Sequence, residues 1–376
     1  MLRFLTAGES HGSHLVAILE GMPSGVPIDT VALAHEMRRR QLGYGRGPRM
    51  QFEPDLAEIV SGVRKGVTMG SPIALLIKNK DASIDRLPVV TQPRPGHADL
   101  TGAIKYDLRD IRNVLERASA RETTARVAVG AVCKQLLSPL GIELASHVTA
   151  LGSIRAKAPS ASLSMALLRR RAEKSPLRCL DAAAEKKMIR EIDARAKAGD
   201  TLGGIFEIIA EGVPPGLGSY VHYDRRLDAI LGRAILSIHA VKAVEVGEGV
   251  AAAGLPGSAV QDEIFYSKAR GFYRSANRSG GLEGGMTNGE PVIVRGFLKP
   301  LSTLKKPLRS VEINTKKPVV GTVERTDVTT VPAAGVIGEA MIAFELANAM
   351  LHKFGGDSLK EIKRNLAGYK QQVTAF

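Results

Sequence analysis

One segment occurs twice in this chain, and the repetition restricts the folds it can adopt. Residues 7–25 read AGESHGSHLVAILEGMPSG and residues 198–216 read AGDTLGGIFEIIAEGVPPG, and the two align without a gap. A second match follows, because residues 66–73 (GVTMGSPI) resemble residues 285–292 (GMTNGEPV). Repeats in the same order predict two related halves within one fold. We expect a single domain over 1–376, with halves at about 1–150 and 198–335.

The repeat also separates chemistry from framework. His11 in the first copy aligns with Leu202 in the second. A single histidine is more often a structural residue than a catalytic one. A framework that accepts leucine at the matching position, however, does not need an imidazole. His11 is therefore a candidate acid or base.

Helix signals occur between and after the repeated segments. Asp29 is placed to cap a helix that stops before Gly43, and a capping-box pattern over 119–122 precedes a small-residue helix, Thr123 to Leu137. Residues 160–200 read as two charged amphipathic helices interrupted at Pro176. C-terminal helices are expected over 336–376.

The charge of the chain allows two classes of partner. With 52 Lys and Arg against 38 Asp and Glu, the net charge is +14, which suits either nucleic acid or a small ligand that carries several anionic groups. Basic runs are short, tryptophan is absent and aromatic residues make up 4%, so few side chains could stack on bases. A focused anion pocket is favoured, and a basic nucleic-acid-binding protein remains the alternative.

Other features point to a cytoplasmic location without membrane attachment. Two cysteines supply neither a disulfide framework nor a metal-ligand set. No run of 18 apolar residues and no secretory signal is seen. The usual phosphate-binding loop of nucleotide hydrolases, metal-ligand spacings and the nucleophile-elbow motif do not occur either. No metal site is therefore expected.

Several arginines occur where anions bind. Arg40 leads into a glycine-rich loop that carries Arg46 and Arg49, and Arg117 and Arg121 flank the start of the helix at Thr123. Helix N-termini and guanidinium groups both attract anions. The alternative is that these arginines form ordinary surface ion pairs or complement a helix C-terminus.

A second group of signals lies in the other half. A segment with five glycines, 280–289, is followed by a strand at 291–297 and by the loop KPLSTLK at 299–305. Glycines let the backbone approach a ligand closely, and a loop of Lys, Ser and Thr suits a phosphate. The remaining candidates for proton transfer are His97, in RPGHAD, and Asp327, in RTD.

These motifs together resemble the chorismate synthase family. The resemblance is carried by GESHG (8–12), RRRQLGYGRGPRM (38–50), RPGHAD (94–99), RASARET (117–123), GGLEGGMTNGEP (280–291), KPLSTL (299–304) and RTDVTTVPAAGV (325–336), with SGV and GSPI in 61–73. It implies an α+β fold, a β-α-β sandwich with an internal pseudo-duplication and helices packed between two antiparallel sheets. It also implies a lyase that converts 5-enolpyruvylshikimate 3-phosphate to chorismate and phosphate by 1,4-anti elimination, the last step of the shikimate pathway.

The resemblance further implies the cofactor, the assembly and the roles of the site residues. Reduced FMN is required without net redox change, and the family is usually a homotetramer. His11 would donate a proton to the leaving phosphate, His97 would keep the flavin monoanionic, and Asp327, with Ser10 as relay, would help to take the C6 proton by way of flavin N5. Substrate would be bound by Arg40, Arg46, Arg49, Arg121 and Arg325. FMN would be bound by Arg117, Ala118, Ser119, His239, Ala240, Gly284, Lys299, Pro300, Leu301, Ser302, Thr303 and Arg325.

One position departs from the family pattern. His239-Ala240 stands where the family usually has Asn-Ala or Gln-Ala beside the flavin. An imidazole can still form hydrogen bonds, but its charge would respond to pH. The chain also carries no additional flavin-reducing domain, so we expect an external flavin reductant, with NADPH as an indirect source of electrons.

Overall fold

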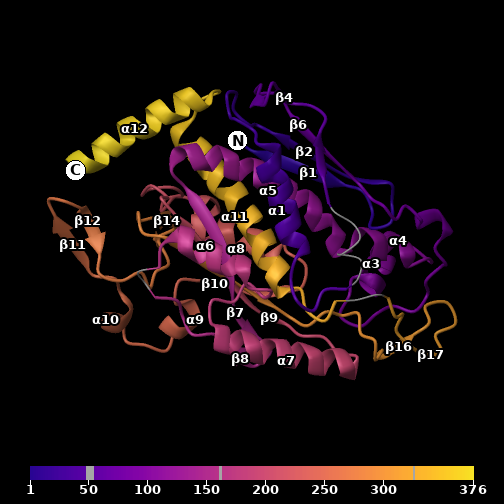
Figure 1. Ribbon diagram of the computed structural model, residues 1–376. Helices are drawn as coiled ribbons and strands as arrows, with labels where there is room; N and C mark the ends of the chain where they lie inside the picture. Colours follow the sequence, from indigo (N-terminus) through magenta and orange to yellow (C-terminus); the bar gives the residue numbers. More distant parts are fainter. Residues whose placement is uncertain (48–54, 161–162, 325–326) are drawn as a thin grey trace.

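The computed structural model describes residues 1–47, 55–160, 163–324 and 327–376. Its two larger sheets are antiparallel (Figure 1). The first has the order β1-β2-β6-β3, with bounds Arg3–Ala7, His14–Glu20, Ile73–Lys78 and Ala57–Ile59. The second has the order β10-β15-β9-β7-β8, with bounds Val241–Val246, Val292–Leu298, Gly204–Glu211, Glu143–Leu151 and Ile154–Arg155.

A layer of helices separates the two sheets, as expected for a β-α-β sandwich. Helix α5 (Thr123–Leu137) packs on the first sheet and α11 (Val331–Phe354) on the second, and the two helices pack against each other. A Cβ atom built on Gly130 would lie 2.3 Å from the Cβ of Ala340, so only glycine permits this crossing. Helices α1 (Thr30–Gln41) and α8 (Leu227–Leu236) complete the layer.

The repeated sequences adopt the same local structure. Thr68 donates from Oγ1 to the Pro23 carbonyl at 2.6 Å and accepts from the Val26 amide at 2.9 Å. Thr287 makes the same pair of bonds, to the Pro214 carbonyl at 2.7 Å and from the Leu217 amide at 2.8 Å. These threonines lie in two matching hairpins, β4–β5 (Val63–Arg64, Val67–Thr68) and β13–β14 (Leu282–Glu283, Met286–Thr287). A buried hydroxyl that satisfies two backbone groups explains why both copies keep a threonine here.

Helix α11 differs from its sequence expectation. It begins at Val331, five residues before the expected start, and it is buried on nearly every side. It is long and apolar enough to cross a membrane, but 89% of its most apolar window is buried inside the protein. A helix enclosed by two sheets and other helices needs no polar face, so periodicity was a poor guide to its limits.

The side chain of Glu339 lies in the middle of this layer, together with its charged partners. Glu339 of α11 is fully buried and accepts two bonds from Arg39 at 2.8 Å, one from Lys134 at 2.6 Å and one from Ser146 at 2.6 Å. Burial alone would raise the pKa of Glu339, but Arg39 and Lys134 hold it well below the usual value. The ionised carboxylate thereby ties α1, α5, α11 and β7 together.

The remaining elements lie around the sandwich. Helix α1 is capped by Asp29, which accepts from the Val31 amide at 2.8 Å, as expected. Ser119 caps a short 3-10 turn, η2 (Ala120–Glu122), and Glu122 bonds Arg126 and Thr6, so the expected capping box is only partly formed. The peripheral helices are α3 (Asp99–Tyr106), α4 (Arg112–Arg117), α6 (Met165–Lys174), α7 (Ala182–Ala198), α9 (Gly249–Ala252), α10 (Gly257–Val260) and α12 (Leu359–Ala375), and the outer hairpins are β11–β12 (Ile264–Ser267, Gly271–Arg274) and β16–β17 (Arg309–Val311, Pro318–Val320).

Candidate active site

A cavity of about 750 Å³ opens where segments from both halves meet. The first half contributes the turn after β1, the 94–98 loop and the start of α5, and the second contributes the loops after α8, β15 and Thr322. The volume is in the range of small-molecule sites.

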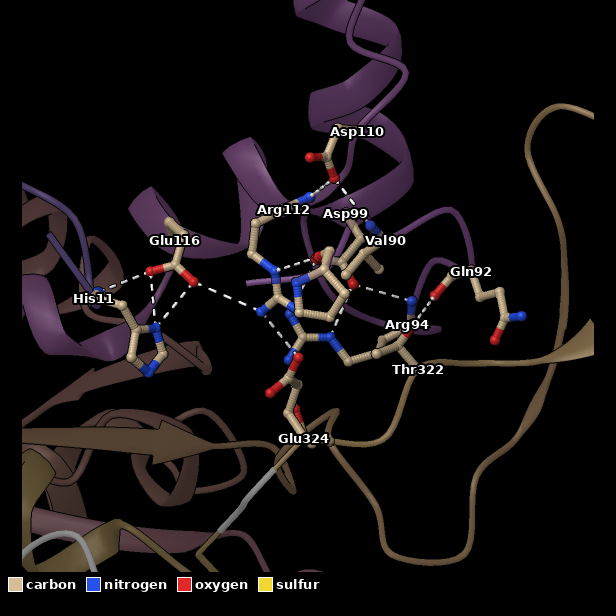
Figure 2. Close-up of polar contacts among 12 residues, drawn as sticks. His11, Val90, Gln92, Arg94, Asp99, Asp110, Arg112, Glu116, Thr322 and Glu324 are labelled. Atoms are coloured by element: carbon tan, nitrogen blue, oxygen red, sulfur yellow. Dashed lines mark hydrogen bonds and ion pairs between the residues drawn. The ribbon is translucent and has the colours of Figure 1, made fainter. Parts of the chain in front are cut away.

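His11 lies on one wall, where a tight turn follows β1. Gly8 has φ of +100°, and a Cβ there would lie 2.2 Å from the His14 carbonyl oxygen, so this turn requires glycine. The His11 Nδ1 atom is 3.0 Å from both carboxylate oxygens of Glu116, and the His11 amide donates to Oε2 at 2.8 Å (Figure 2). The opposite ring nitrogen, Nε2, lies 4.0 Å from Asp81, another residue of the cavity wall.

His97 has a similar carboxylate partner. Its Nδ1 atom is 2.5 Å from Asp99 Oδ1, and Asp99 is fully buried. Burial alone would raise the pKa of Asp99, but the bonds from His97 and Arg94 hold it below the ordinary range. Arg94 also donates to Thr303 Oγ1 at 2.8 Å, which joins the histidine loop to the loop after β15.

Two buried arginines share one carboxylate on another wall. Arg40 contacts Asp55 at 3.4 Å and donates to Thr123 Oγ1 and the Ala120 carbonyl, both at 3.0 Å. Arg121 also bonds Asp55, and it donates to Asn79 Oδ1 at 3.0 and 2.9 Å. Burial, with smaller contributions from Arg46 and Arg121, lowers the pKa of Arg40 to about 10. Two guanidinium groups on one carboxylate leave positive charge for a ligand.

The loop after β15 closes the cavity against the histidine loop. Lys299 Nζ and Ser302 Oγ donate to the Gly96 carbonyl at 2.8 and 3.0 Å. Beside them, the Lys299 amide donates to the Ala240 carbonyl at 3.0 Å, and Ala240 is a non-glycine residue with φ of +65°. Strained backbone of this kind is concentrated at functional sites.

The segment after Thr322 brings Asp327 to the cavity. Asp327 Oδ1 accepts from the Gly47 amide at 2.5 Å, and Oδ2 lies 3.4 Å from Arg46 Nε. The carboxylate therefore connects the glycine-rich loop of the first half with the second half. Both residues of the pair line the cavity.

Most of the residues expected from the sequence meet at this cavity. The lining includes Ser10, His11, Arg40, Arg46, His97, Ala118, Ser119, Arg121, His239, Ala240, Lys299, Leu301, Ser302, Thr303 and Asp327. Arg49 and Arg325 lie outside the described residues. Pro300 does not line the cavity.

Two residues that were expected to contact the flavin, Arg117 and Gly284, do not line the cavity. The exposed Arg117 side chain turns toward β1 and donates to the Gly8 and Thr6 carbonyls at 3.0 and 2.9 Å, so only Arg121 of that pair converges on the cavity. Gly284 lies in the β13–β14 hairpin, next to Tyr220. The Gly285 carbonyl accepts from the amide of Leu227, the first residue of α8. The cavity residue His239 follows the C-terminal end of α8, so Gly284 lies near the end of the helix that is away from His239.

Sequence reasoning missed the residues that hold the site together. Arg94 and Arg112 line the cavity, and Glu116, Asp99 and Asp55 stand behind its histidines and arginines. Arg94 and Asp99 were within a recognised motif, RPGHAD, and their charge in that motif was the available signal. Glu116, in a helix without a motif of its own, gave none.

The wall of the cavity is rich in cations. Its cations are Arg40, Arg46, Arg94, Arg112, Arg121 and Lys299, whereas its carboxylates are Asp81, Glu324 and Asp327. Asp55, Asp99 and Glu116 offset part of this charge from behind, but the arginines and lysine lie closer to the cavity. Among the described residues no cluster of three or more metal-ligating side chains is found. The arrangement suits an anion with several charged groups, next to histidines that can transfer protons.

Comparison with known proteins agrees with this geometry. A family model described as chorismate synthase matches residues 2–351. The chain is 53% identical to a chorismate synthase of Symbiobacterium thermophilum, over 99% of both chains, and 52% identical to one of Geobacter sulfurreducens, over 100% of both. A solved structure titled "Crystal Structure of Chorismate Synthase" matches with a TM-score of 0.83 and 44% identity, covering 100% of this chain and 99% of the other. The chain belongs to the chorismate synthase family.

Proposed function

We propose that this cavity binds 5-enolpyruvylshikimate 3-phosphate beside reduced FMN and releases chorismate and phosphate by 1,4-anti elimination. The observation that carries the proposal is the pair of buried arginines, Arg40 and Arg121, that share Asp55 at the cavity wall. A phosphate or carboxylate of the substrate would satisfy the guanidinium charge that Asp55 leaves unbalanced. Arg46 would bind another anionic group of the substrate, and so would Arg49 and Arg325, which lie outside the described residues.

The residues present also suit a flavin. The His239 Nδ1 atom is buried and has no hydrogen-bond partner among the described residues, so a polar atom of a ligand could pair with it. Lys299, Ser302 and Thr303 would hold the phosphate of FMN, and Ser119 and Ala240 would border the ring. When bound there, reduced flavin would supply transient electron density for the elimination.

The protein's own part is to bind, orient and transfer protons. The His11 Nε2 atom would give a proton to the phosphate as it leaves, because Nδ1 is engaged by Glu116. His97, with Nδ1 held by Asp99, would balance the charge of the flavin. Asp327, with Ser10 as relay, would accept the proton that leaves C6. We also propose a homotetramer in the cytoplasm that receives reduced flavin from an external reductant, with NADPH as the indirect electron source.

Two measurements test the proposal. Under anaerobic conditions, the protein with reduced FMN should convert 5-enolpyruvylshikimate 3-phosphate to chorismate, and without flavin it should not. In calorimetric titrations, Arg121→Ala should weaken substrate binding by about 2–5 kcal/mol, the usual loss when one partner of a buried charge pair is removed. Arg126→Ala is the matched control, because Arg126 lies five residues further along, in α5, and pairs with Glu122 outside the cavity lining. Equal affinities of the two variants would remove Arg121 from the substrate site.

A further inference from the structure

Glu116 contacts the turn that carries Ser10 and His11 through both its backbone and its side chain. Its backbone carbonyl accepts from the Ser10 amide at 3.1 Å. Its carboxylate accepts from the His11 amide at 2.8 Å, and both oxygens lie 3.0 Å from His11 Nδ1. Figure 2 shows the carboxylate between the ring of His11 and the guanidinium of Arg112. One residue of α4 thus fixes the backbone and the ring of the candidate proton donor.

The environment of Glu116 keeps its carboxylate ionised. The side chain is completely buried, and burial alone would raise the pKa of Glu116. The hydrogen bonds and charge of His11, followed by the charge of Arg112, outweigh that penalty and lower the pKa. A buried carboxylate without such partners would be neutral and could not restrain an imidazole in the same way.

We infer that Glu116 is a positioning residue that determines which nitrogen of His11 delivers the proton. An anionic carboxylate within hydrogen-bond distance of Nδ1 accepts a hydrogen bond there, so the Nδ1 proton stays in place throughout. The proton that can leave is then the one on Nε2. When it passes to an oxygen of the departing phosphate, the imidazolium becomes a neutral ring protonated on Nδ1, and charge and protons balance. This inference rests on the proposed role of His11 as donor.

Arg112 extends this arrangement to the other half of the chain. Its Nη1 atom lies 3.7 Å from Glu116 Oε1 and 3.0 Å from Glu324 Oε1. Each glutamate is followed by an arginine, and each Glu-Arg pair precedes one of the two central helices by the same number of residues. Arg112 therefore bridges corresponding positions of the two halves, and Figure 2 shows it lying between both carboxylates. The bridge fixes Glu116 from the side opposite to His11.

A double-mutant cycle tests whether Glu116 acts through His11. Glu116→Gln is nearly isosteric, and it should lower kcat at least about tenfold with KM nearly unchanged, because Glu116 contacts His11 rather than the ligand. In a His11→Asn background, the same substitution should change kcat by less than about threefold, because no ring remains to be oriented. Equal losses in both backgrounds would mean a general structural role and would overturn the inference.

The chain offers a matched control for a buried glutamate paired with histidine. The Glu207 carboxylate pairs with His147 and Arg295, neither of which lines the cavity, and its Oε1 atom lies 2.9 Å from His147 Nε2 in the second sheet. Glu207→Gln should leave kcat unchanged. If it lowers kcat as much as Glu116→Gln does, the effect of Glu116→Gln is not specific to His11, and the inference fails.

A measurement on the unaltered protein removes dependence on how the variants fold. Neutron diffraction from crystals in D₂O should show deuterium on His11 Nδ1, directed at Glu116. Deuterium on Nε2 alone would overturn the inference, whatever the variants do. If Nδ1 carries deuterium but His11→Asn turns over normally, then the orientation holds and the proposed donor role of His11 fails, so the two ideas are distinguishable.

Discussion

The buried carboxylate of Glu339 should be the most consequential single charge for stability. In Glu339→Gln, Arg39, Lys134 and Arg178 keep their charges, while their shared central anion is lost. Glu36 and Glu173 remain as partial partners of Arg39 and Lys134. Removing one member of a buried ion network typically costs about 3–5 kcal/mol, because the remaining charges stay buried without compensation. We expect a loss of that size in the free energy of unfolding at pH 7.5.

The dependence on pH provides an internal check. The pKa of Glu339 in the folded protein lies well below the ordinary glutamate value of 4.5. A carboxylate of this kind adds stability above its unfolded pKa, and the contribution is lost as pH falls through the folded pKa. The difference between wild type and Glu339→Gln should therefore be full at pH 7.5 and should shrink as the pH is lowered below about 4.5.

Urea unfolding at fixed protein concentration measures both effects. The control is Glu345→Gln on the same helix, where burial raises the pKa of the carboxyl and its partner Arg233 is largely exposed. That change should cost less than about 1 kcal/mol, because a pair with an exposed member contributes little. If Glu339→Gln loses no more stability than the control, or if its loss does not depend on pH, then the Glu339 carboxylate does not stabilise the fold as an anion.

Two further predictions concern packing and the unusual histidine. Gly130→Ala should lower the free energy of unfolding by about 1–3 kcal/mol or more, because its Cβ would overlap Ala340. Gly368→Ala on α12, with open space around it, should raise that free energy by up to about 1 kcal/mol. Equal effects of the two substitutions in urea unfolding would contradict the close helix crossing. Burial, with a smaller contribution from the charge of Arg126, lowers the pKa of His239 below 6.5. Wild type should therefore lose thermal stability relative to His239→Asn as the pH falls below that value. Parallel Tm curves between pH 7.5 and 5.5 would show that His239 is not held neutral.

The repeat was the part of the sequence that carried the most structural information. It predicted matching halves, and Thr68 and Thr287 make the same two buried hydrogen bonds. The match could be read from the sequence because Pro23 and Thr68, and likewise Pro214 and Thr287, lie inside the repeated segments. Helix α11 was harder to delimit, because its burial on nearly every side removes the polar face from which a helix is recognised.

The partners of the site residues could not be predicted, because they depend on how distant segments pack. Glu116 is 105 positions from His11, and Asp55 is 66 positions from Arg121. The comparison with Leu202 predicts that leucine is tolerated at position 11. Leu202, however, packs in the apolar core, whereas His11 contacts a buried carboxylate that leucine would leave without its ring partner. Asparagine is the better replacement, because its amide nitrogen can occupy the place of Nδ1 while Nε2 is removed.

In the proposed mechanism, phosphate release depends on a proton that His11 donates. The direct measurement is the anaerobic single-turnover rate of chorismate formation by His11→Asn, with reduced FMN and saturating substrate, alongside its thermal unfolding. We predict a protein that unfolds near the wild-type temperature, binds flavin and substrate, and turns over about 10²–10⁴-fold more slowly, the usual contribution of a general acid. A folded His11→Asn protein that forms chorismate at the wild-type rate would show that His11 is not the proton donor.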